Sequence, residues 1–135
     1  MNKIFIGLVF SFALNAFALQ EREIVAAVLI AEAGGEPVAG MREVAGVIQN
    51  RARFSGKTQT QVVTKPLQFS CLNGKSVLAL VQQARKHPKF GAALEIAGQK
   101  QKTDATHYYN PKLASPSWAR SLKVTKRIGN HVFLK

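Results

Sequence analysis

The sequence predicts a single α+β domain that is mainly helical and carries a small antiparallel β-sheet near its C-terminus. Apolar residues recur at helical spacing through most of the chain, whereas short runs rich in β-branched and aromatic residues occupy its end. No internal repeat and no Pro/Gly/Ser-rich linker divides the chain. Helices first and strands last is the order typical of an α+β domain.

The first 18 residues have the composition of a secretory signal peptide. Lys3 supplies a basic start, an apolar stretch follows, and small residues stand at Ala16 and Ala18. The apolar run is short and charged residues follow it closely, which disfavours a transmembrane helix. We therefore expect cleavage after Ala18 and one mature domain over residues 19–135, secreted or periplasmic and without a stable membrane anchor. An uncleaved anchor is the alternative.

Two helices are predicted at the start of the mature domain. Residues 21–33 carry an apolar stripe at helical spacing, and the pair Gly34-Gly35 ends that helix. A second helix follows at once, with Pro37 in its first turn and an apolar stripe over residues 38–52.

The rest of the chain contains weaker helical patterns and then strands. Pro66 forces an extended or looping stretch, and Ser76 is placed to cap a helix. Gly129-Asn130 can turn the chain between two strands. The expected elements are helices over 60–63, 76–86 and 90–98, and strands over 105–109, 122–128 and 131–134.

The chain is strongly basic. Lys and Arg number 19 against 7 Asp and Glu, which gives a formal net charge of +12. Such a protein is drawn to polyanions, and for an exported protein these include anionic wall polymers and the carboxylates of cell-wall peptides. Nucleic acid is the alternative, but no Lys/Arg run interleaved with aromatics and no recognisable nucleic-acid module is present, so we expect no nucleic-acid partner.

Cys71 is the only cysteine, so no intramolecular disulfide can form. A lone cysteine next to an apolar residue is more often a small buried hydrophobe than a nucleophile. His107 and His131 with Asp104 and Cys71 are conceivable metal ligands, but no compact spacing such as HExxH or CxxC supports them. We expect neither a metal nor a cofactor.

Glu32 is the strongest candidate for chemistry among the few acidic residues. Val28 and Leu29 lie one helical turn before it, which places its carboxylate beside the apolar stripe. Partial burial and the negative end of the helix dipole both favour the protonated carboxyl group, which is the form a general acid needs. The alternative is a glutamate that caps or forms a salt bridge within the fold.

Aromatic and amide side chains suit carbohydrate recognition, because sugar rings stack on aromatic faces and their hydroxyls form hydrogen bonds. Core packing is the alternative for Phe69 and Trp118. Adjacent tyrosines on a strand face opposite ways, so we expect at most one of Tyr108 and Tyr109 to line a groove. The candidate groove residues are Gln68, Phe69, Tyr108, Tyr109, Asn110 and Trp118.

Several motifs, in order, resemble the SleB/CwlJ-type cell-wall hydrolase family. They are AEAGGEPVAGMREVAGVIQNR, QFS, ATHYYNP, a tryptophan at Trp118 and IGNHVF. The resemblance spans nearly the whole mature chain, and the A-E-A-x-G-E-P block is its most specific part. It implies a lysozyme-like fold and an enzyme that cleaves peptidoglycan glycan strands between N-acetylmuramic acid and N-acetylglucosamine. We expect the chain to be a monomer.

By the same resemblance Glu32 corresponds to the family's catalytic glutamate, and Glu36 is structural or substrate-orienting. A lytic transglycosylase, which forms 1,6-anhydro-muramic ends, needs no second carboxylate. That suits the scarcity of acidic residues here. The alternatives are a hydrolytic muramidase that uses Glu36 or Asp104 as its second carboxylate, and a non-catalytic basic module that binds the cell wall.

Overall fold

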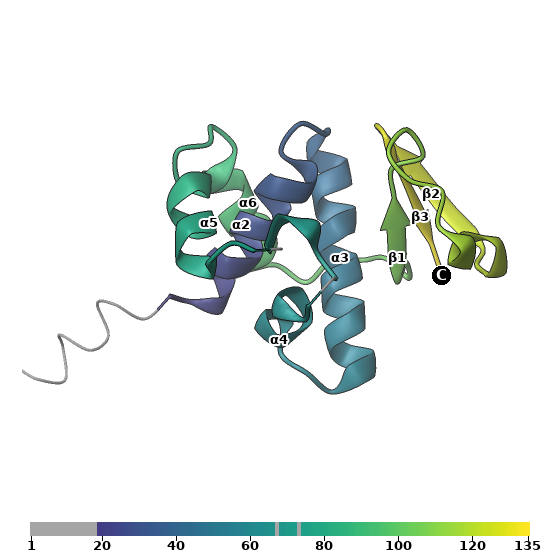
Figure 1. The fold of residues 1–135 in the computed structure, drawn as a ribbon, viewed down its shortest axis with the longest axis horizontal. Helices are drawn as coiled ribbons and strands as arrows, with labels where there is room; N and C mark the ends of the chain where they lie inside the picture. The colour runs from purple at the N-terminus through teal and green to yellow at the C-terminus, as the bar shows by residue number, and fades with distance from the viewer. Residues whose placement is uncertain (1–18, 67, 73) are drawn as a thin grey trace, which may run out of the picture.

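The computed structural model describes residues 19–66, 68–72 and 74–135 (Figure 1). Five α-helices come first in this part of the chain, and three short strands come last. The helices are α2 (Glu21–Ala33), α3 (Val38–Ser55), α4 (Gln59–Thr64), α5 (Val77–Ala84) and α6 (Phe90–Ala97). The strands are β1 (His107–Tyr109), β2 (Val124–Ile128) and β3 (His131–Leu134), and the 3-10 turns are η1 (Ser70–Leu72) and η2 (Ser117–Ser121).

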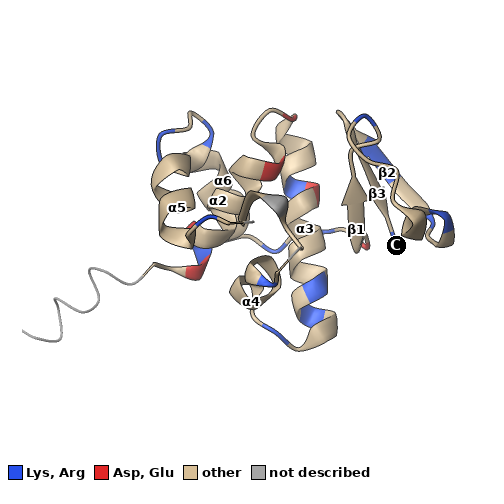
Figure 2. Ribbon diagram, viewed as in Figure 1, with Lys and Arg blue, Asp and Glu red and all other residues tan. Residues whose placement is uncertain are grey.

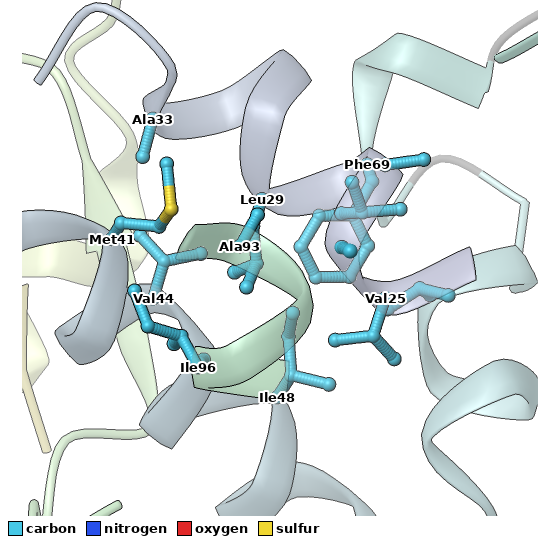
Figure 3. Close-up of a cluster of buried hydrophobic side chains, with 14 of the residues drawn as sticks. Val25, Leu29, Ala33, Met41, Val44, Ile48, Phe69, Ala93 and Ile96 are labelled. Atoms are coloured by element: carbon cyan, nitrogen blue, oxygen red, sulfur yellow. The ribbon is translucent and has the colours of Figure 1, made fainter. Parts of the chain in front are cut away.

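Helix α2 is the centre of the helical part, because α3, α4, α5 and α6 all pack against it. Its residues from Ile24 to Leu29 are all buried, so it is apolar around most of its circumference. Figure 3 shows its Val25 and Leu29 meeting side chains of α3 and α6 in one cluster. The core is therefore built around the helix that ends with Glu32 and Ala33.

The sheet has the order β1-β3-β2, with both neighbours antiparallel to β3. Tyr108 is paired with Phe133 across the β1–β3 ladder. Gly129 makes the β2–β3 turn with a φ of 55°, a left-handed conformation that glycine adopts without strain. Every residue of β3 is buried, whereas β1 is an edge strand of three residues.

Asn50 and Glu43 of α3 attach the helices to the segment that leads into β1. The Asn50 amide donates to the carbonyls of Thr103 and Ala105, both at 2.9 Å. The buried Glu43 carboxylate accepts from the Thr103 hydroxyl and from Lys126 of β2. These contacts fix the position of β1 relative to α3.

The structure confirms the predicted α+β class and the order of its elements. Ser76 caps α5 by accepting from the backbone N–H of Ala79, and the first helix covers the predicted residues 21–33. The predicted signal peptide over residues 1–18 lies outside the described residues. Within the described part of the chain, no helix is both long and apolar enough to cross a membrane.

Candidate active site

A single large groove runs along the face where the helices meet the sheet, with a volume of about 1650 Å³ among the described residues. Figure 1 shows α4 and α5 on one side of α3 and the sheet on the other. Residues from all of these elements line the groove, together with the end of α2. It is therefore the place where the chain can hold a long, narrow molecule.

Glu32 lies in the groove on the last turn of α2, half-buried beside the core. The Tyr108 hydroxyl of β1 donates to its Oε2 atom at 3.0 Å. Burial first, and then the nearby Glu32 carboxylate, raise the pKa of Tyr108 well above its ordinary value. The tyrosine therefore stays protonated and remains a donor to Glu32.

The Cys71 thiol is the second group beside Glu32. Burial, followed by the charge of Glu32 and a hydrogen bond to it, raises the pKa of Cys71 to about 12. The thiol is thus neutral at ordinary pH and is not the reactive thiolate that a nucleophile needs. It differs from the expected buried hydrophobe, since it is only half-buried and lines the groove.

Arg51 of α3 connects the floor of the groove to both flanking segments. Its Nε donates to the Thr106 carbonyl at 2.8 Å, and its Nη1 lies 3.5 Å from the Gln68 amide oxygen. Its guanidinium carbon lies 5.8 Å from the centre of the Phe69 ring. Arg51 thus holds the strand that carries Tyr108 and the loop that carries Gln68 on the same helix.

An aromatic platform, formed by His107, Tyr109 and Trp118, makes the sheet side of the groove. The ring centres of His107 and Trp118 are 5.0 Å apart, and those of Tyr109 and Trp118 are 5.9 Å apart. Trp118 remains 38% exposed. Burial and the charge of Arg51 lower the pKa of His107, which favours its neutral ring. Such a surface suits the apolar face of a sugar ring.

Glu36 also borders the groove, but its carboxylate is used by the fold. It is only 8% exposed, and its Oε2 accepts from the backbone N–H of Asn130 at 3.1 Å. A Cβ on Gly129 would lie 2.0 Å from the same oxygen, so the β2–β3 turn closes directly on this side chain. Glu36 therefore fixes the sheet against the loop that follows Glu32.

The seven acidic residues all lie in the described part of the chain, so their positions can be compared. Glu32 and Glu36 line the groove, and the other five do not. Asp104 is exposed and forms an ion pair with Lys135. As a result, Glu32 is the acidic residue in the groove whose carboxylate is not bound to the backbone of the fold.

The structure brings most of the predicted groove residues together. Gln68, Tyr108, Tyr109, Asn110 and Trp118 all line the groove with Glu32 and Glu36. Two expectations were wrong. Phe69 lies in the core at 2% exposure (Figure 3), because its ring packs beneath Arg51. Both tyrosines line the groove, because β1 is a short edge strand and both its faces border the opening.

Sequence reasoning missed Arg51, His107 and His131 as groove residues. His131 is buried, and its ring centre lies 5.1 Å from that of Tyr108. Each of the three falls in a motif recognised above, in IQNR, ATHYYNP or IGNHVF, so the motifs were the available signal. Among the described residues, no group of three or more His, Cys, Asp or Glu side chains is placed to hold a metal ion.

The chain is similar to a known protein family over most of its length. A family model described as Cell Wall Hydrolase matches residues 35–134. The chain belongs to the cell wall hydrolase family. Glu32 lies just before the segment that the family model matches, and Glu36, Tyr108, Trp118 and His131 lie within it.

The chain is 33% identical over 115 residues to a spore cortex-lytic enzyme of Halalkalibacterium halodurans, a match that covers 82% of the chain and 33% of that relative. It is 30% identical over 125 residues to a spore cortex-lytic enzyme of Bacillus cereus, covering 90% of the chain and 46% of the relative. The chain thus spans between a third and a half of the length of these relatives.

Two solved structures are similar to this chain. One is the catalytic domain of the germination-specific lytic transglycosylase SleB from Bacillus anthracis, with a TM-score of 0.66 and 26% identity over 88% of this chain and 98% of that one. The other is the catalytic domain of the Bacillus cereus SleB protein, with a TM-score of 0.61 and 26% identity over 88% of this chain and 94% of that one.

Proposed function

We propose that this chain cleaves the glycan strands of peptidoglycan as a lytic transglycosylase, with Glu32 as general acid and then general base. The proposal rests on a groove in which one carboxylate is not bound to the backbone of the fold. Glu32 lines the same groove as the aromatic platform and accepts a hydrogen bond from the Tyr108 hydroxyl, whereas the Glu36 carboxylate accepts from the backbone of Asn130.

In the first step, Glu32 donates its proton to the glycosidic oxygen as the bond between that oxygen and C1 of N-acetylmuramic acid breaks. In the second step, the Glu32 carboxylate accepts the proton of the C6 hydroxyl on the same sugar while O6 bonds to C1. The products are a free hydroxyl on the departing strand and a 1,6-anhydro ring on the other. Water is not consumed, and Glu32 ends protonated as it began.

Tyr108 has a positioning role in this scheme. Its hydroxyl hydrogen bonds to Oε2 at 3.0 Å, and it remains protonated because of its raised pKa. A hydrogen bond to an ionised acceptor is stronger than one between neutral groups, so this contact stabilises the carboxylate that forms after the first proton transfer. The same contact holds Glu32 in one orientation for both steps.

The relatives support the same reaction. The Bacillus anthracis structure is named as a germination-specific lytic transglycosylase, and the curated relatives are named as spore cortex-lytic enzymes. Since peptidoglycan lies outside the cytoplasm, we place the site of action there, with residues 1–18 as the export signal. A hydrolytic muramidase would need a second carboxylate near Glu32, and Asp104 lies outside the groove.

The test is mass spectrometry of the soluble products released from purified peptidoglycan by the wild type and by Glu32→Gln. Glu95→Gln is the control, because it removes the same charge from an exposed residue outside the groove. We expect anhydro-muropeptides from the wild type and the control, and none from Glu32→Gln. Reducing-end products would indicate hydrolysis, and full activity of Glu32→Gln would refute the role of Glu32.

A further inference from the structure

The two sides of the groove differ in chemistry. The aromatic platform forms the sheet side, and a row of four lysines, here called the lysine row, borders the helical side. Its members lie in the loops and helix ends around α4 and α5, which Figure 1 shows on the other side of α3 from the sheet. The lysine row consists of Lys57, Lys65, Lys75 and Lys86.

The charges of the lysine row are not used by the fold. All four side chains are exposed, and none forms an ion pair or a side-chain hydrogen bond with any described residue. Three cations elsewhere in the described residues form ion pairs: Lys126 with Glu43, Lys135 with Asp104 and Arg85 with Glu23. Figure 2 shows Lys and Arg spread over the whole fold, so the position in the groove is what distinguishes this row.

We propose that the lysine row binds the carboxylates of the peptide stems that branch from the glycan strand. This inference rests on the proposed function. The lysines and the platform of Trp118 and Tyr109 line the same groove, so a strand held on the platform brings its lactyl-linked stems into the groove that the lysine row borders. The stems carry free carboxylates, and an ammonium group on a flexible side chain can follow a mobile carboxylate. The row therefore makes the enzyme selective for glycan that carries charged stems.

The experiment compares two substrates that share one glycan backbone. Sacculi free of teichoic acid are divided, and the carboxylates of one half are converted to amides with a carbodiimide and methylamine. The variant Lys57→Gln/Lys65→Gln/Lys75→Gln/Lys86→Gln removes the row. The control Lys100→Gln/Lys102→Gln/Lys123→Gln/Arg127→Gln removes the same four charges from exposed residues that do not line the groove.

At low salt we expect the wild type to cleave native sacculi about tenfold faster than amidated sacculi, since four exposed ion pairs contribute modestly each. The row variant should lose about tenfold on native sacculi and little on amidated ones, and the control should keep the wild-type preference. An unchanged rate on amidated sacculi also shows that the row variant is folded.

Two results would overturn the inference: a row variant that keeps the preference, or an equal loss in both variants. Binding of the same variants to both substrates is measured in parallel. If the wild type released no product from either substrate, the proposed function would fail, and the binding data alone would decide whether the lysine row recognises stem carboxylates.

Discussion

At the scale of single residues, the site depends on a carboxylate shared between two neutral donors. Tyr108 reaches Glu32 from the sheet, and Cys71 reaches it from the loop before α5. Both neighbours have raised pKa values because burial and the charge of Glu32 disfavour their ionised forms. Tyr108 and Cys71 therefore remain neutral donors to the Glu32 carboxylate.

Replacing Tyr108 with phenylalanine should lower kcat on peptidoglycan by about 10- to 100-fold, because it removes one hydrogen bond to a charged group. The ring and its packing on Phe133 are retained, so the fold should persist. Tyr109→Phe is the control, since the Tyr109 hydroxyl has no hydrogen-bond partner among the described residues and the change should cost little. A Tyr108→Phe enzyme with the wild-type rate would contradict the positioning role.

The Cys71 thiol should resist alkylation at pH 9, where an ordinary thiol is half ionised, because its pKa is about 12 in the folded chain. The rate of labelling by iodoacetamide, compared between folded and urea-unfolded protein, tests this. Because the pKa of the thiol is higher in the folded than in the unfolded chain, its contribution to the free energy of unfolding is fully present below pH 9. That contribution is lost as the pH rises toward 12. Rapid labelling of folded protein at pH 9 would show that the thiol is not shielded.

At the scale of elements, α3 connects the helices to the sheet. Gly46 allows this, because a Cβ there would lie 2.1 Å from Cγ2 of Thr103. The absence of a side chain lets the segment before β1 run close against the helix, where Asn50 and Glu43 hold it. The position of Tyr108 beside Glu32 therefore depends on a contact that Gly46 makes five residues before Arg51 on the same helix.

Gly46→Ala should destabilise the chain by about 1–3 kcal/mol, because the added methyl group forces Thr103 from its place. Gly91→Ala is the matched control: it lies in the first turn of α6 with nothing within 4 Å of the new Cβ. There the change should stabilise by about 0.5–1 kcal/mol, since alanine loses less conformational entropy in a helix. The midpoints of urea unfolding measure the change in stability of both variants. Equal changes would refute the close approach of Thr103 to Gly46.

The sequence was sufficient to predict the helices and strands because caps, glycines and prolines mark their ends locally. Ser76, Gly34 and Gly129 each act within a few residues of their own position. The contacts that complete the site, in contrast, join residues that are far apart in the sequence. Tyr108 and Glu32 are 76 residues apart, and Arg51 and Thr106 are 55 apart. Nothing in local spacing predicts such pairs, so Arg51 was missed and Phe69 was misplaced.

At the scale of the whole molecule, we expect charge to attract the chain to its substrate and the shape of the groove to position that substrate for cleavage. We expect the excess of Lys and Arg over Asp and Glu to attract the chain to an anionic wall over distances at which no contact is made. On the proposed function, the aromatic platform and the lysine row of the groove then select what is cleaved. Attraction of this kind is screened by salt, whereas stacking of sugars on aromatic rings is not.

Binding of the inactive Glu32→Gln variant to sacculi should therefore weaken strongly as salt rises from about 0.05 to about 0.5 M. Sedimentation of the sacculi and assay of the supernatant measure the bound fraction without cleavage. The same titration with the control variant that lacks four charges outside the groove should begin from a lower bound fraction. Binding that does not change with salt would show that net charge does not hold this chain to the wall.

In the proposed reaction, a single carboxylate closes an intramolecular ring without water. Digestion of peptidoglycan in water enriched in heavy oxygen tests this, because hydrolysis places an oxygen atom from water on each new muramic end. We expect soluble products whose muramic ends are anhydro rings and carry no heavy oxygen. Muramic reducing ends labelled with heavy oxygen would contradict it and would require a second group that activates water beside Glu32.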